Sequence, residues 1–322
     1  MSDALYVRGR DDVRATAAAA VSPADVWQMG DGRAAVYQPT LGAVSGDRIG
    51  LTSIGQFTMP KTASVVLLDG QRAYWDYSAL SVTFRKVNDR DFYLGRIVGD
   101  CASADTTCVV NLNVDPKYDI DLQSDAFLSV PTGTQAVGAF GFPKILGGAQ
   151  SVELTATNEA QCIDLLSVNR VAIVSNPIFE AEIRIPVNGS TSDVDFNIGL
   201  ADGTSTTDAD AIATSCFFHI DGGALDIFAE SDDGTTEVAA TDTTVNATAG
   251  SAVANRIHLM IDARNPADVQ MYIDGVLVLG SSVFVLTAGA AALGILVHLE
   301  KVSGTATGRF VIDRATVRIG KQ

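Results

Sequence analysis

The stretch Val269-Gln-Met-Tyr-Ile-Asp-Gly-Val-Leu-Val-Leu279 decides the fold class. Val269, Met271 and Ile273 occupy alternate positions, which is typical of a strand with one buried face. Asp274-Gly275 then supplies the positive φ angles that a two-residue hairpin turn requires. The stretch therefore predicts a β-hairpin with Val276 also facing inward.

The same signals recur along the second half of the chain. Alternating apolar residues over 257–262, 293–300 and 314–319 predict further strands, and Asp-Gly pairs recur between such stretches. Helix signals are nearly absent, and the Ala-rich stretch 15–20 is too short to hold as an isolated helix. The sequence predicts an all-β protein built from antiparallel sheets.

The first half reads as shorter strands that glycines interrupt. We expect strands at residues 34–37, 50–57, 72–75, 92–98 and 108–114. Pro131, Pro143 and several glycines mark residues 116–146 as a linker with a first edge strand. We therefore predict a small N-terminal domain over 1–115, whose residues 1–20 form an extended arm, and a second domain over 147–322.

Charge is distributed unevenly over the 322 residues. Residues 1–150 carry 13 Lys and Arg against 16 Asp and Glu, and residues 151–322 carry 9 against 22. The acidic second half would be repelled by nucleic acid and by anionic membranes. Met1–Arg14 has no apolar run, so we expect no secretory signal, and no stretch has the length of a membrane-spanning helix. The simplest interpretation of the net charge of −16 is solubility.

The four cysteines, Cys101, Cys108, Cys162 and Cys216, do not have the C-x-x-C spacing of a zinc site. Without a secretory signal, free buried thiols are the default expectation. A disulfide between Cys101 and Cys108 across a hairpin is the alternative.

Three sets of residues have side chains that could catalyse a reaction or bind a metal. Glu180, Glu182 and Arg184 share one strand face, where a glycosidase would place two carboxylates, but the neighbouring arginine favours a solvated ladder of charges. The three histidines would bind zinc only if their strands converged, and otherwise belong to polar faces. They are His219, His258 and His298. The loop carboxylates offer hard oxygen ligands for calcium, without EF-hand spacing. They are Asp202, Asp208 and Asp210, with Asp232 and Asp233 in a second loop.

No serine-hydrolase elbow, P-loop or dinucleotide-binding motif occurs in the sequence. The aromatic residues Trp27, Tyr74, Trp75 and Tyr77 could stack on sugars, but their apolar neighbours favour a place in the core. The residues therefore predict no enzyme, no catalytic residue and no cofactor.

The first half resembles a family of tailed-phage capsid decoration, or head cement, proteins. The resemblance covers residues 1–114 and is carried by three motifs: Gly46-Asp-Arg-Ile-Gly-Leu-Thr-Ser-Ile-Gly-Gln-Phe-Thr-Met-Pro-Lys61, Asp69-Gly-Gln-Arg-Ala-Tyr-Trp-Asp76, and Leu94-Gly-Arg-Ile-Val-Gly99 with Asp105-Thr-Thr-Cys-Val-Val-Asn-Leu112. Gln71 stands where the family usually has Asp, and the stretch 85–90 is more charged than usual.

This resemblance implies a β-sandwich or barrel that trimerises through residues 1–115 and clamps major capsid protein at local three-fold axes. An extended arm could add a strand to a capsid sheet edge, and three contacts would give avidity. The implied location is the outer capsid surface of the virion, after synthesis in the host cytoplasm.

The second half is similar to concanavalin-like jelly rolls of the laminin-G kind. Phe179–Ile185, Asp195-Phe-Asn-Ile-Gly-Leu-Ala-Asp-Gly203 and Val269-Gln-Met-Tyr-Ile-Asp-Gly-Val-Leu277 carry the likeness over residues 145–322. The sequence as a whole therefore predicts a capsid decoration protein that displays a lectin-like domain. The alternative is a carbohydrate-binding adhesion module for host or environmental glycans.

Overall fold

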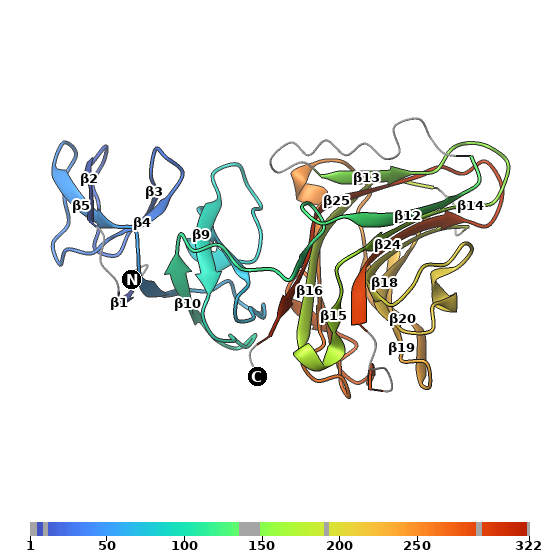
Figure 1. The fold of residues 1–322 in the computed structure, drawn as a ribbon. Coiled ribbons are helices and arrows are strands. Elements are labelled where there is room, and N and C mark those ends of the chain that lie inside the picture. The colour runs from blue at the N-terminus through green and yellow to red at the C-terminus, as the bar shows by residue number, and fades with distance from the viewer. Residues whose placement is uncertain (1–4, 9–11, 135–148, 190–192, 288–291, 321–322) are drawn as a thin grey trace. The chain divides into compact units, whose positions relative to one another are not determined.

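The computed structural model describes residues 5–8, 12–134, 149–189, 193–287 and 292–320. The chain divides into two compact units, Met1–Lys117 and Tyr118–Gln322, each with its own buried apolar clusters (Figure 1). Strands make up nearly all the regular structure, and their pairings are antiparallel. The predicted all-β fold class is confirmed. Three short 3-10 helices occur among the described residues: η1 (Ile173–Ser175), η2 (Ala209–Ala211) and η3 (Val253–Asn255).

The first unit consists of two antiparallel sheets that share an apolar core. The six-stranded sheet has the order β1 (Leu5–Arg8), β6 (Gln56–Pro60), β10 (Thr107–Leu112), β9 (Phe92–Ile97), β7 (Arg72–Asp76) and β8 (Ser81–Thr83). The four-stranded sheet has the order β2 (Asp12–Thr16), β5 (Arg48–Thr52), β4 (Ala34–Tyr37) and β3 (Val26–Gln28). Val26 and Val36 of the smaller sheet pack in one cluster with Phe57 and Trp75 of the larger sheet.

Two sequence-based predictions about this unit were wrong. Residues 12–17 do not extend as an arm, because β2 pairs with β5 and Ala17 is buried with its N–H bonded to the Asp47 carbonyl. The strand predicted over 50–57 is divided into β5 and β6. Gly55 lies in the break between the two strands. Its φ of 130° is outside the range of a β-strand and is a conformation that glycine adopts readily.

The second unit is a jelly-roll sandwich of two large antiparallel sheets around one core. The seven-stranded sheet has the order β11 (Ile120–Asp121), β25 (Gly308–Ile319), β16 (Pro177–Asn188), β21 (Ile257–Asp262), β22 (Gln270–Ile273) and β23 (Val276–Val278), with β13 (Gln150–Glu153) also paired to β25. The eight-stranded sheet has the order β12 (Phe127–Thr132), β14 (Gln161–Ser167), β24 (Ala292–Lys301), β17 (Val194–Ala201), β18 (Ser215–Asp221), β19 (Asp226–Asp232) and β20 (Glu237–Asn246), with β15 (Val171–Ala172) also paired to β24. Phe179 and Phe310 of the first sheet pack with Phe196 and Phe218 of the second.

The segment predicted as linker and edge strand, 116–146, contributes β11 and β12 to the two sheets of this unit, and its residues 135–146 lie outside the described part of the chain. The hairpin that decided the fold class is present as β22 and β23. Asp274 and Gly275 have φ of 48° and 75°, the backbone of a primed two-residue turn. Val276 does not face the core as predicted: it is 49% exposed, because β23 is the last strand of its sheet.

Candidate functional site

The outer face of the eight-stranded sheet carries a row of ionisable side chains. Core residues such as Phe196, Phe218 and Leu299 alternate along their strands with residues of the opposite face. Cross-strand register aligns that face into one row, which runs from Asp164 through His298, Asn197 and His219 to Phe228. Two histidines of different strands thus lie in the same row, and each has its own carboxylates.

Around His219 lies the first cluster, which we name the open group: Asp195, Asp210, His219 and Glu230. His219 Nε2 is 3.2 Å from Asp195 Oδ1. The other ring nitrogen, Nδ1, is 3.8 Å from Glu230 Oε1 and 4.0 Å from Asp210 Oδ1. Both His219 Nδ1 and Glu230 Oε1 are buried without a hydrogen-bond partner. The ring of Phe228 meets the imidazole edge to face, with centroids 5.8 Å apart.

Charge is crowded in the open group. Burial, followed by the neighbouring Asp210 carboxylate, raises the pKa of Glu230 to about 9. Burial and the nearby Asp208 also raise the pKa of Asp210. Burial would lower the pKa of His219, but Asp195 and the other carboxylates outweigh it and raise that pKa. The group therefore holds more negative charge than its single histidine can balance.

The loop between β17 and β18 places Asp210 over the sheet. Ile212 of this loop is buried against Leu166, Ala201 and Leu296. Asp208 caps η2, and its carboxylate accepts a hydrogen bond of 2.9 Å from the Asp210 N–H. The loop is therefore fixed on both sides of Asp210.

The second cluster surrounds His298, and we name it the closed group: Cys162, Asp164, His298 and Glu300. His298 Nδ1 is 2.7 Å from Asp164 Oδ1, and Nε2 is 3.3 Å from Glu300 Oε2. Asp164 also accepts a hydrogen bond from the Ser205 N–H of the covering loop. Although burial opposes it, hydrogen bonding to Asp164 raises the pKa of His298 well above its ordinary value. Each ring nitrogen therefore lies within 3.3 Å of a carboxylate oxygen, and the imidazole is fully buried.

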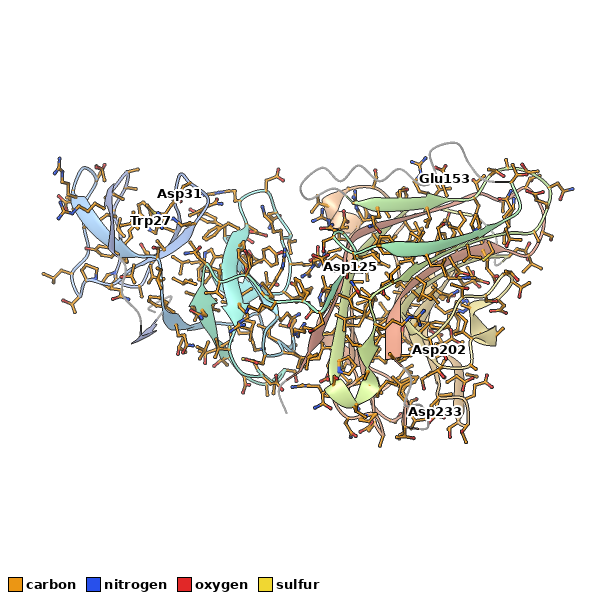
Figure 2. All side chains as sticks on the ribbon, in the orientation of Figure 1. Trp27, Asp31, Asp125, Glu153, Asp202 and Asp233 are labelled. Carbon is orange, nitrogen blue, oxygen red and sulfur yellow. The ribbon has the colours of Figure 1, made fainter. Side chains whose placement is uncertain are left out.

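Of the three aspartates predicted for calcium, only Asp210 takes part in a cluster of potential ligands among the described residues. Asp208 is used as the cap of η2, and Asp202 lies at the start of the loop (Figure 2). In the second predicted loop, Asp233 is buried and accepts hydrogen bonds from the N–H groups of Thr235, Thr236 and Thr287. The structure does not bring the predicted carboxylates together as a set.

The three histidines do not converge either. His219 and His298 are two strands apart on the eight-stranded sheet, and His258 belongs to β21 of the other sheet. His258 and His298 lie opposite the core face of their strands, as expected of polar-face residues, but both are fully buried there. The sequence shows on which face of its strand each histidine lies. It does not show which strands are neighbours, and so it does not show which carboxylates lie beside each histidine.

The glutamates predicted as a solvated ladder are buried. Glu180 is 1% exposed and forms an ion pair with Arg318, while Glu182 accepts a hydrogen bond of 2.9 Å from Arg314. Burial alone would raise the pKa of Glu180, but Arg318 and its neighbours hold it well below the ordinary value. Arg184 pairs instead with Asp313 at 2.6 Å. This prediction failed because the cationic partners lie on β25, more than 100 residues away in sequence.

In the first unit, a groove of about 770 Å³ is lined by Ala18–Ala20, Trp27, Tyr77 and Arg90. The guanidinium of Arg90 lies over the Tyr77 ring, 3.5 Å from its centroid. Trp75 is buried in the core as predicted, whereas Tyr77 is 41% exposed. Trp27 is visible on the smaller sheet in Figure 2. Tyr74 is half-buried and packs edge to face against Tyr93, outside the core cluster that contains Trp75, so it does not lie in the core as predicted.

All four cysteines are free and buried. Cys101 and Cys108 do interact, since hydrogen bonding to Cys108 lowers the pKa of Cys101 to about 7. Among the described residues, no helix has the length and apolar character needed to cross a membrane.

The comparison with protein families concerns the first unit. Residues 7–112 match the family described as phage cement protein. The predicted resemblance of this half of the chain is confirmed, over one third of the sequence and nearly all of the first unit. The comparison with curated proteins found no match.

The solved structures that are similar to this chain share at most a fold with it. The carbohydrate recognition domain of Emp47p is 11% identical, with a TM-score of 0.42 over 62% of this chain and 94% of that one. A structure from work on endo-acting O-glycanases of the human gut microbiota is 12% identical, with a TM-score of 0.38 over 55% and 82%. LamAcat from Zobellia galactanivorans is 14% identical, with a TM-score of 0.35 over 48% and 68%.

Proposed function

We propose that the chain is a structural protein of a phage virion, which decorates the outer surface of the head through its first unit and displays its second unit. The observation that carries this proposal is the match of residues 7–112 to the phage cement family, because it spans almost the whole first unit. Attachment of this kind depends on buried area and geometry, so no catalytic group is required of the first unit.

The first unit offers surfaces suited to attachment. β2 is an edge strand of the four-stranded sheet, and an edge strand can pair with a strand of another protein. A second groove of about 670 Å³ beside this strand carries Arg14 and Arg48. We propose the major capsid protein as the partner and a homotrimer at local three-fold axes as the assembly, since three linked contacts would strengthen binding by avidity.

Glycan binding by the second unit stays the alternative function that the sequence suggested. The outer face of its eight-stranded sheet carries polar side chains, but the loop between β17 and β18 covers part of that row through Ser205 and Ile212. A glycan array probed with the full chain tests this alternative, and binding tighter than millimolar would support it.

Head binding is the direct test of the proposed function. Heads of the encoding phage, prepared from a strain in which the gene is deleted, would be mixed with the purified full chain and sedimented. We expect the chain to sediment with the heads and the number of bound chains per head to reach a plateau. We also expect a trimer to dissociate from the heads more slowly than a single chain would. A chain that stays in the supernatant at every concentration would contradict the proposal.

A further inference from the structure

The open group has the features of a binding site whose ligand is a cation. Glu230 is 6% exposed, yet its Oε1 atom has no hydrogen-bond partner and points toward His219 Nδ1, which also has none. Buried polar atoms are normally paired, so two unpaired polar atoms facing each other require an explanation. Asp210 Oδ1 completes a triangle of potential ligand atoms, all within 4.8 Å of one another.

We propose that Asp210, His219 and Glu230 bind a divalent transition-metal ion, with Zn²⁺ as the ion that suits them best. One imidazole nitrogen and two carboxylate oxygens are a common zinc ligand chemistry. Bonds of about 2.0–2.1 Å in a tetrahedral site place ligand atoms roughly 3.4 Å apart. The observed separations of 3.8 and 4.0 Å need to shorten by only a fraction of an ångström.

Asp195 prepares the histidine for this role. When His219 Nε2–H donates to Asp195 Oδ1, 3.2 Å away, the lone pair is left on Nδ1, the atom that faces Glu230 and Asp210. Metal-binding histidines usually have such a carboxylate behind them, which fixes the tautomer and the ring plane. Phe228 fixes the same ring from its edge.

Access and charge also favour a cation. The Asp210 side chain is 45% exposed, so an ion can reach the group from solvent along the loop. Zinc would neutralise carboxylates that now lie close to one another, in exchange for the protons that Glu230 and His219 hold. Three protein ligands leave a fourth position for water or for a ligand atom.

The closed group serves as an internal contrast. It also combines a histidine with acidic side chains on the same face, but His298 Nδ1 is already 2.7 Å from Asp164 and Nε2 faces Glu300. Nδ1 is therefore occupied by Asp164, and Nε2, which makes no hydrogen bond among the described residues, lies on a fully buried ring that an ion cannot reach from solvent. We therefore assign binding to the open group alone.

The test uses the full chain, stripped of metal with a chelator, dialysed and titrated with ZnCl₂ in a calorimeter. We expect one zinc ion per chain, a rise in the melting temperature of the second unit, and visible absorption when Co²⁺ replaces zinc. Asp195→Asn should weaken zinc binding about 10–100-fold, the usual cost of losing such a partner. His219→Gln and Asp210→Asn should remove saturable binding, and His298→Gln should keep it.

Asp210 is on an exposed part of the loop, so Asp210→Asn keeps the test valid if His219→Gln fails to fold. Zinc binding that is unchanged in Asp210→Asn and His219→Gln would overturn the proposal, as would the absence of zinc binding in the unaltered chain. A parallel titration with CaCl₂ tests the calcium site that the sequence predicts: calcium binding that persists in His219→Gln, without zinc binding, would assign the carboxylates to a hard cation instead.

Discussion

The two units neutralise their buried charges in different ways. In the first unit, Lys61 donates to the backbone carbonyls of Thr62 and Val65, and Asp91 accepts hydrogen bonds from the N–H groups of Tyr77, Val87 and Asn88. In the second unit, Asp233 also binds backbone groups, but other buried charges pair with each other across strands, as Glu180 does with Arg318 and Asp164 with His298. The first unit therefore relies on apolar packing and local turns, while the second also relies on long-range charge pairs.

This difference leads us to expect different responses to mutation and pH. Pairs of buried charges are costly to break, because removal of one partner leaves the other desolvated and uncompensated. When a buried charge binds backbone groups that are close to it in sequence, as Lys61 does, its hydrogen bonds form together with the local turn. The second unit should therefore be the more sensitive to charge-changing substitutions, and the first should be little affected by them.

The largest expected effect is on attachment to the head, which we expect of the first unit and not of the second. Residues 1–117 and 118–322, expressed separately, each retain their own apolar core. We expect the first fragment to bind heads and to form a trimer, and the second to do neither, because its excess of acidic residues would be brought together three times. Sedimentation with heads and light scattering measure both properties. A trimeric second fragment beside a monomeric first fragment would reverse the assignment.

The next effect is the loss of a buried charge. Glu180→Gln removes the carboxylate that pairs with Arg318, whose side chain is 4% exposed. We expect the free energy of unfolding of the second unit to fall by about 3–5 kcal/mol, as measured by denaturant titration. The matched control is Glu153→Gln, which breaks the more exposed pair with Arg309 and should cost about 0–1 kcal/mol. Equal losses in the two variants would show that burial does not decide the cost.

A backbone change in the same unit should have a smaller effect. Gly275 has φ of 75°, which a β-branched residue adopts only with strain. Gly275→Val should lower the free energy of unfolding of the second unit by about 1–3 kcal/mol. Calorimetry of the full chain would show one transition shifted and the other unchanged. A single cooperative transition that shifts as a whole would mean that the two units unfold together.

The smallest expected effect is a loss of stability of the second unit at alkaline pH. The pKa of His298 is raised in the folded state, so the stability that it contributes is fully present below its unfolded pKa of about 6.5 and is lost as pH rises through the folded pKa. The slope for one proton is at most about 1.4 kcal/mol per pH unit. His298→Gln should flatten this dependence in the melting temperature of the second unit. A slope that the substitution leaves unchanged would place the titrating group elsewhere.

The sequence predicted the parts of the fold that local patterns encode. The hairpin turn at Asp274-Gly275, the strand at 257–262 and the all-β class follow from turn chemistry and from period-two alternation, which act over a few residues. The inward position of Val276 failed, because alternation does not reveal that a strand lies at the edge of its sheet.

The charged clusters could not be predicted in the same way. Glu180 and Arg318 are far apart in sequence, and so are Asp164 and His298, so only the strand order makes them neighbours. Alternation correctly placed Glu180, His298 and Arg318 opposite the core face, and the usual inference from that position is contact with solvent. Pairing between charges, together with a covering loop over the eight-stranded sheet, allows the second face to be buried as well.

Electron cryo-microscopy of the phage head, with and without the chain, tests the central claim most directly. We predict extra density at the local three-fold positions of the outer surface, with the first unit against the shell and the second unit extending outward. Density in which the second unit contacts the shell while the first extends outward, or identical maps from the two particles, would contradict it.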